Sequence, residues 1–432
     1  MVKQALDSHI MLCKLHCKDK TMERDNNHIE RGTSDYRRAN LALFIAGFVT
    51  FSTLYTFQPL FPLLVSEFSI SPALASLTLS AATFALAWML PISGSFSDVY
   101  GRKTLMGIAL LMTSLLSLAC FTDTTLTTLL LIRLLQGVVL AGVPAVAMAY
   151  LNDEMSPRAI GAAMGLYIAG NACGGMVGRI LTSFLVDMFS WRQTVAIIGL
   201  IALLLSCLFW LLPPSKNFHR QSFSLKNTSN TLLSHLREPG LFCLFTLAFL
   251  LMGSFVTVYN YATFYLLSSP YNLSQSQVAL IFIAYAFGAC GSGVMGELTS
   301  RFERPRILLT ALGIMATGIL LTLLNSLSAI IAGIVVFTIG FFGAHAVASA
   351  WVGVRATTAR AQASSLYLLA YYLGSSISGT GGGVVWSAMG WYGVVGLVLV
   401  LLVTAGTVVQ FLVAMENKKP DWESSVQCNL HS

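Results

Sequence analysis

The chain has 432 residues, of which 56% are hydrophobic and 10% are charged, and its mean hydropathy is +0.74. Soluble domains carry roughly 25% charged residues, so this composition excludes an ordinary water-soluble fold. The net charge of +7 is spread over short joints and tails, which argues against nucleic acid as a partner. The composition predicts an integral membrane protein whose surroundings are the lipid bilayer.

Apolar runs of about 20 residues, each long enough to cross about 30 Å of hydrocarbon, follow one another along the chain. Because lipid offers the backbone no hydrogen-bond partners, runs this long and apolar are expected to be helices. Six spans are predicted at 41–65, 73–95, 105–121, 126–151, 159–186 and 191–212. Six more are predicted at 241–267, 277–298, 307–324, 327–352, 362–386 and 391–415. The expected fold class is an all-α membrane protein with twelve transmembrane helices.

These spans divide the chain into five parts. We expect a disordered cytoplasmic tail, a six-helix half, a cytoplasmic linker, a second six-helix half and a cytoplasmic tail, at 1–40, 41–212, 213–239, 240–415 and 416–432. With both termini placed in the cytoplasm, 22 of the 25 Lys and Arg residues fall in cytoplasmic segments and only Arg192 lies outside. This asymmetry predicts that both termini are cytoplasmic.

Two stretches of the first half recur in the second. Residues 94–102 parallel 296–304 at an offset of 202, and 167–170 parallel 371–374 at an offset of 204. Two pseudo-symmetric halves of six helices are the organisation of many secondary transporters, whose substrate binds near the midplane. We therefore expect a transporter, not an enzyme, that moves a small molecule by alternating access. The chain has no protease-like zinc motif or nucleophile elbow, and no metal or cofactor is expected.

The joint between spans two and three carries the most specific pattern. Asp98 at a helix end can accept charge-assisted hydrogen bonds from Arg102 or from a partner helix, and Gly101 permits a tight turn. We predict a gating loop with matching positions in the second half, built from Gly94, Asp98, Gly101, Arg102, Lys103, Gly296 and Arg304. The alternative is that Arg102 and Lys103 only set the orientation in the membrane. In the second half, Glu297 or Glu303 would replace the missing acid.

Two residues within the spans are candidates for proton coupling. Arg133 is costly at membrane depth, so it should face the interior and couple protons or substrate, unless its side chain extends to an interface or is fixed to a neighbouring carbonyl. Every Asp and Glu lies in a tail, a joint or a helix end. His345 is the only residue within a span that titrates near neutral pH, and it is a candidate proton carrier, with a structural role as the alternative.

Polar and aromatic side chains in otherwise apolar spans are candidates for substrate contact. Arg179 either binds an anionic substrate or pairs with Asp187. Pro59 and Pro62 are expected to loosen the first span nearby. The remaining candidates also have helix packing as an alternative role, and the predicted set is Tyr55, Gln58, Gln136, Asn171, Arg179, Tyr259 and Asn260.

Several of these elements resemble the major facilitator superfamily over nearly all of residues 36–415. Residues 94–103 fit its G-x-x-x-D-x-x-G-R-[KR] pattern, Arg133 to Gly137 fit R-x-x-Q-G, and the joint at 187–192 is similar. Segments 254–257, 340–345 and 362–367 resemble drug/proton antiporter-like bacterial members. The resemblance implies a Gram-negative inner-membrane location, proton-driven export and no bound cofactor. Separately, we expect the protein to be a monomer.

One departure from the antiporter pattern concerns the fifth span. Gly165, Gly174 and Gly178 have the spacing of the motif G-x8-G-x3-G-P, but Arg179 occupies the proline position. The glycines still permit close helix packing. The arginine favours a second hypothesis, an importer or facilitator of a small organic anion or a sugar-like solute.

Overall fold

A computed structural model describes residues 28–122, 125–217 and 225–416, apart from the side chains of Ser95, Asp98 and 225–228. The first half contains α2 (Ser34–Tyr55), η1 (Gln58–Leu60), α3 (Phe61–Phe68), α4 (Pro72–Tyr100), α5 (Arg102–Ala119), α6 (Leu126–Leu140), α7 (Pro144–Glu154), α8 (Ile160–Val186) and α9 (Trp191–Phe209). After α10 (Leu225–Arg237), the second half contains α11 (Pro239–Leu267), α12 (Gln275–Ala279), η2 (Leu280–Ile283), α13 (Ala284–Leu298), α14 (Arg304–Leu321), α15 (Leu327–Arg355) and α16 (Arg360–Glu416).

The described residues form 11 helical segments that are long and apolar enough to cross a membrane. The last of them, α16, has 57 residues and is interrupted at Gly390, whose φ of 59° and ψ of −148° are not helical. Because a positive φ suits glycine and few other residues, Gly390 allows the chain to reverse there. The helix therefore crosses twice, and the prediction of twelve crossings is confirmed.

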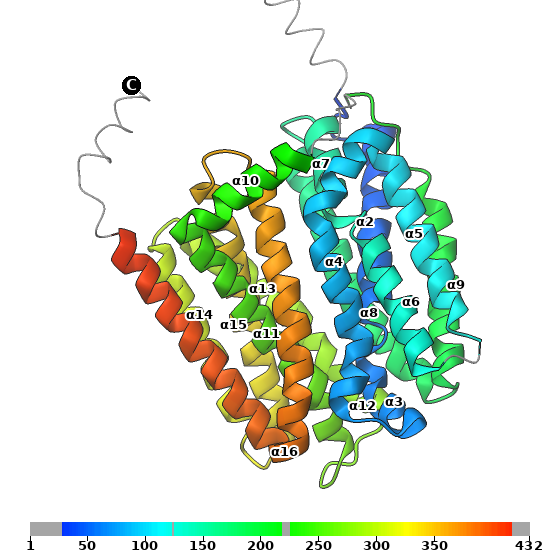
Figure 1. The fold of residues 1–432 in the computed structure, drawn as a ribbon, viewed down its shortest axis with the longest axis vertical. Helices are drawn as coiled ribbons and strands as arrows, with labels where there is room; N and C mark the ends of the chain where they lie inside the picture. Colours follow the sequence, from blue (N-terminus) through cyan, green and yellow to red (C-terminus); the bar gives the residue numbers. More distant parts are fainter. Residues whose placement is uncertain (1–27, 123–124, 218–224, 417–432) are drawn as a thin grey trace, which may run out of the picture.

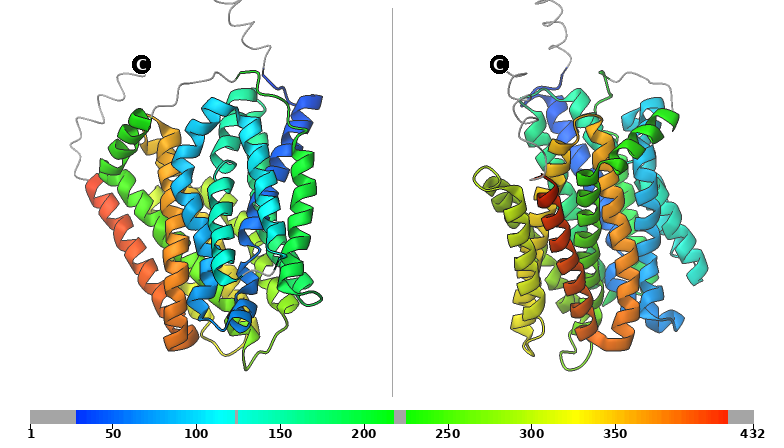
Figure 2. Two further views of the ribbon diagram at one scale, coloured as in Figure 1. Left: turned by 45° about the vertical axis from the view of Figure 1, so that its right-hand side comes forward. Right: turned by 60° about the vertical axis from the view of Figure 1, so that its left-hand side comes forward.

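The bundle has two distinct ends. At one end lie α10, the beginning of α2 and the end of α16 (Figure 1), and we call this the linker end. At the other end lie α3, α12 and the reversal of α16, and we call this the far end. The long helices run between the two ends in all views (Figure 2). Large apolar side chains such as Trp88, Leu204 and Val403 remain exposed on the outside, as expected for surfaces that face lipid.

The two halves repeat the same helix pairings. In the first half α2 packs on α8, α4 on α6 and α5 on α9, whereas in the second α11 packs on α16, α13 on α15 and α14 on α16. Close backbone contacts repeat as well, because a Cβ atom added to Gly170 would lie 2.5 Å from the Phe44 carbonyl oxygen, and one added to Gly374 would lie 2.1 Å from that of Phe249. These contacts support the duplication that the sequence repeats indicate.

Some boundaries differ from the predicted ones. The first span begins at Ser34 and is broken at η1, where Pro59 and then Pro62 cannot donate backbone hydrogen bonds. The second span continues to Tyr100, and the predicted linker contains α10. The predicted disorder of the tails falls largely on 1–27 and 417–432, which lie outside the described residues.

The end of the N-terminal segment is attached to the first half. The Ile29 amide donates to the Glu154 carbonyl at 2.7 Å, and the Ser156 amide donates to the Ile29 carbonyl at 3.2 Å. Ile29 itself is buried. Residues 28–33 therefore belong to the folded part of the chain, although the sequence analysis placed them in the tail.

Candidate functional site

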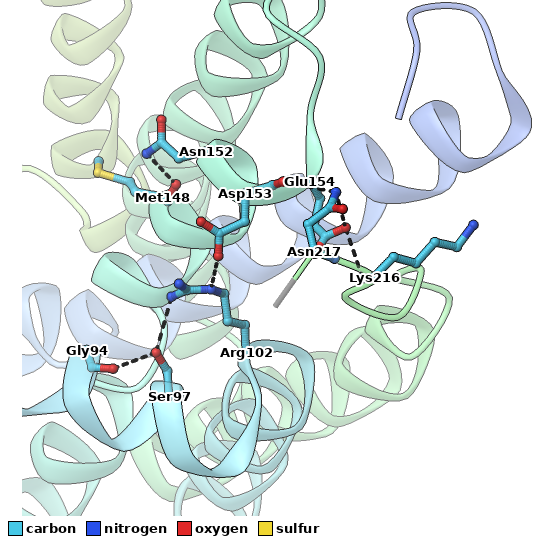
Figure 3. A network of polar contacts seen from close by, with 9 residues as sticks. All are labelled: Gly94, Ser97, Arg102, Met148, Asn152, Asp153, Glu154, Lys216 and Asn217. Atoms are coloured by element: carbon cyan, nitrogen blue, oxygen red, sulfur yellow. Dashed lines mark hydrogen bonds and ion pairs between the residues drawn. The ribbon is translucent and has the colours of Figure 1, made fainter. Parts of the chain in front are cut away.

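The predicted gating segment lies at the linker end of the first half (Figure 3). Gly94 belongs to α4, and Gly101, with a φ of 91°, separates α4 from α5. The Arg102 Nε donates to the Asp153 Oδ2 at 2.7 Å, and its Nη1 lies 3.4 Å from the Ser97 hydroxyl. Arg102 therefore links the start of α5 to the end of α7. The Asp98 side chain, its expected partner, lies outside the described part.

Two neighbours complete this end of the first half. The Lys103 ammonium donates to the Trp210 carbonyl at 2.9 Å, beyond the end of α9. The Glu154 carboxylate accepts hydrogen bonds from the backbone amides of Lys216 and Asn217, each at 3.0 Å. The helix ends and the first residues of the linker are thus held together by polar contacts.

The second half is held differently at the linker end. Gly296 is part of α13, Arg304 begins α14, and Glu303 pairs with Arg306 in the same turn at 3.3 Å. The principal ion pairs come from Arg355 at the end of α15, which contacts Glu238 at 2.9 Å and Glu416 at 2.7 Å. Arg355 thus joins α15 to the start of α11 and the end of α16.

Glu238 lies before the first residue of α11, outside the membrane-spanning segments. Partial burial raises the pKa of this carboxyl, but hydrogen bonds from Arg355 and the Leu241 amide outweigh that effect and leave the pKa below its ordinary value. Glu238 also caps the N-terminus of α11 through its Oε2. The charged form is therefore the form that the folded structure favours.

Arg133 is completely buried and binds the broken end of α2. Its Nη1 and Nη2 donate to the carbonyls of Thr53 and Leu54, at 3.2 and 2.6 Å, and its Nε donates to the Thr78 carbonyl at 2.6 Å. The last carbonyls of a helix have no partner within it, and the helix dipole favours a cation there. These contacts match the carbonyl-bound alternative, and they join α2, α4 and α6.

Two of the predicted substrate residues have polar atoms engaged with other side chains, and a third has a buried oxygen without a partner. Gln136 accepts from Arg133 at 2.6 Å and donates to Ser117 at 2.9 Å. The Tyr259 hydroxyl lies 2.7 Å from that of Thr338, between α11 and α15. The Oδ1 of Asn171 is buried without a hydrogen-bond partner in the described structure.

Four of the predicted residues meet at the junction between the halves. Arg179 of α8 is buried, its guanidinium carbon lies 3.8 Å from the centre of the Tyr55 ring, and its Nε donates to the Gln58 Oε1 at 2.5 Å. The Gln58 Nε2 donates to the Asn260 Oδ1 of α11 at 2.7 Å. A polar chain thus crosses from one half to the other in the membrane interior. Asp187, the alternative partner of Arg179, instead accepts from the Ser276 amide at 3.0 Å.

Other hydrogen bonds join the halves between the far end and the middle of the bundle. The Thr83 hydroxyl of α4 lies 2.7 Å from that of Ser376 in α16. The Thr380 hydroxyl donates to Ser80 at 2.8 Å and lies 3.5 Å from Ser76. Together with the Asp187 contact, these bonds hold the two halves together toward the far end.

His345 lies in α15 among aromatic rings. Its Nδ1 is 3.0 Å from the Tyr367 hydroxyl, and its ring lies 4.8 Å from that of Tyr371 and 6.0 Å from that of Phe341. No direct contact between His345 and Arg179 occurs in the described residues, and the two are linked through successive ring contacts of Tyr285, Phe342 and Phe341.

Three features of the site were not predicted from the sequence. They are Asp153 as the partner of Arg102, the pair of Arg355 with Glu238, and the rings of Phe282 and Tyr285 beside Arg179. The acids were visible as charges at span ends, but which cation each one meets depends on the helix arrangement. Aromatic residues in apolar spans gave no signal that separates packing from binding.

Two six-helix halves joined through polar groups in the membrane interior define a transporter of the twelve-helix type. The sequence profile described as Major Facilitator Superfamily matches residues 43–269 and 255–427. The chain belongs to this superfamily, and it is a multi-pass membrane transporter.

Relatives and a solved structure agree with this assignment. The chain is 44% identical over 395 residues to the uncharacterized MFS-type transporter YybF of Bacillus subtilis (strain 168), covering 91% of this chain and 98% of that protein. It is 44% identical over 392 residues to the inner membrane transport protein YnfM of Escherichia coli (strain K12), covering 90% of this chain and 94% of that protein. The structure of a bacterial homolog of the human lysosomal transporter Spinster, in an inward-facing and unoccupied conformation, shares the fold with a TM-score of 0.74 at 17% identity. The match covers 88% of this chain and 98% of that one.

Proposed function

We propose that this protein is a secondary active transporter that exports a small organic drug or metabolite by alternating access in exchange for protons. The observation that carries the proposal is the buried polar chain from Arg179 through Gln58 to Asn260, which joins the halves in an otherwise apolar interior. Polar groups are costly at such a place, so their presence indicates a role in substrate binding or in the conformational change. The second candidate is import or facilitated passage of a small organic anion or a sugar-like solute, which Arg179 favours.

The orientation is part of the proposal. The linker end carries the basic segments, so both termini and α10 would be cytoplasmic, in an inner membrane. The bonds between the halves lie from the far end to the middle, which supports a conformation closed to the periplasm. A tag in the linker at 218–224 that reacts with an impermeant reagent from the periplasm would contradict this orientation.

His345 is the proposed proton carrier. Its Nδ1 contacts the Tyr367 hydroxyl, and the side chain is only partly buried in the helix bundle. An imidazole in such a place is a candidate for taking up and releasing a proton. Arg133, whose donors are directed at backbone carbonyls, would take part only by positioning the helices.

The test is proton movement in vesicles that contain the purified protein. An inward-acidic gradient should drive substrate transport, and substrate addition should dissipate the gradient. His345→Gln should abolish proton-coupled transport while leaving substrate exchange intact, because exchange needs no net proton transfer. Transport that is unaffected by the gradient would favour facilitated passage instead.

A further inference from the structure

The two buried arginines of the first half differ in how their charge is satisfied. Arg133 makes four hydrogen bonds, three of them to backbone carbonyls. Arg179 donates to the Gly175 carbonyl at 2.6 Å and to Gln58, and it also forms a side-chain hydrogen bond with Tyr55. A guanidinium has five N–H donors. Arg179 therefore has donors to spare, and within the described part of the chain it forms no ion pair with a carboxylate.

A buried cation without a counter-ion is expensive in a medium of low dielectric constant. The face of the Tyr55 ring compensates part of the charge, as do Phe282 and Tyr285, whose centres lie 5.2 and 5.0 Å from the guanidinium carbon. Ring faces, however, do not replace in-plane acceptors for the N–H groups. The positive charge that remains uncompensated, and the N–H groups that remain without an acceptor, fit an oxyanion.

The surroundings also indicate what the anion is attached to. The rings come from both halves, with Tyr55 on α2 and Phe282 and Tyr285 on η2 and α13. From Tyr285 the aromatic surface continues to Phe342 and Phe341, with ring centres 5.6 and 5.5 Å apart in turn. Such rings favour a planar apolar body by stacking.

We propose that Arg179 binds the carboxylate of an aromatic organic anion, which takes the place of the Gln58 amide oxygen. This inference rests on the proposed transport function and names its substrate class. Carboxylates bind guanidinium groups in a bidentate manner and more strongly than a neutral amide does. The Gln58 oxygen is thus the internal competitor of the substrate.

Displacement of Gln58 has a consequence for the contact between the halves. Gln58 also donates to Asn260, whose Nδ2 is buried without a partner. Once the anion holds Arg179, Gln58 is no longer fixed by it, and the hydrogen bond between the halves loses its support. Binding at the site therefore favours separation of the halves at this level of the bundle, and the substrate itself shifts the population of conformations.

The experiment measures binding of benzoate and 2-naphthoate to the purified full-length protein by thermal shift and calorimetry, with benzamide and 2-naphthamide as neutral counterparts. At least one acid should raise the melting temperature, and its amide should not. Arg179→Gln should weaken binding of that acid at least ten-fold. Arg192→Gln, at the exposed Glu67 pair, is the matched control and should bind as the wild type does.

Gln58→Ala gives the opposite expectation and keeps the test decisive if Arg179→Gln does not fold. Removal of the competing oxygen should tighten binding of the acid several-fold, whereas a purely structural Gln58 would leave the affinity unchanged or lower it. The proposal is overturned if neither acid binds, if the amides bind equally well, or if Gln58→Ala does not tighten binding. Arg179-dependent binding of an acid that moves no protons in vesicles would count against the proposed proton exchange alone.

Discussion

At the scale of single residues, Arg133 makes a break in a membrane helix tolerable. It binds the carbonyls of Thr53 and Leu54, which the interruption at η1 leaves without helical partners. Arg133→Ala should lower the free energy of unfolding by at least about 2 kcal/mol, because four hydrogen bonds at roughly 0.6 kcal/mol each are lost in the membrane. Reversible unfolding in mixed micelles measures this loss. Arg306→Ala, at an exposed pair, should leave the midpoint unchanged, and equal stability of Arg133→Ala would contradict the capping role.

Glu238 gives a prediction about pH. Its pKa in the folded protein lies below the ordinary value of 4.5, so its charged form contributes stability above that value. This contribution should disappear as the pH falls below about 4.5 and through the folded pKa. Melting temperatures from pH 6 to pH 3.5 should therefore fall more steeply for the wild type than for Glu238→Gln. Parallel curves would show that the Arg355 pair adds nothing.

At the scale of elements, two glycines of α8 differ in whether close helix packing requires them, although both match the spacing of the sequence motif. A Cβ atom on Gly174 would lie 2.3 Å from the Phe48 carbonyl oxygen of α2, whereas one on Gly165 would have nothing within 4 Å. Gly174→Ala should cost about 1–3 kcal/mol, since the backbones must move apart. Gly165→Ala, in the same helix, should be neutral or slightly stabilising. Similar unfolding midpoints for both variants would refute the close contact between α2 and α8.

The sequence predicted the elements better than their contacts. The number of spans followed from long apolar runs, because hydropathy reports directly on what can lie in lipid. The internal repeat followed from matching segments at offsets of 202 and 204. The break at Pro59 followed from proline chemistry. That Arg102 meets Asp153 of another helix, and whether Arg179 meets Asp187 or Gln58, depends on helix rotation and on the distance between spans, which local residue patterns do not encode.

At the scale of the whole molecule, alternating access requires the halves to separate at the far end. In the present conformation Ser76 of α4 and Thr380 of α16 lie with their hydroxyl oxygens 3.5 Å apart, on opposite halves. A double Ser76→Cys, Thr380→Cys variant should form a disulfide under mild oxidation and lose transport, because the covalent bond prevents that separation. Reduction should restore transport, and each single variant, treated in the same way, should stay active. If the cross-linked protein transported at the wild-type rate, the halves would not need to part at this contact, and a rocking motion about the midplane would be excluded.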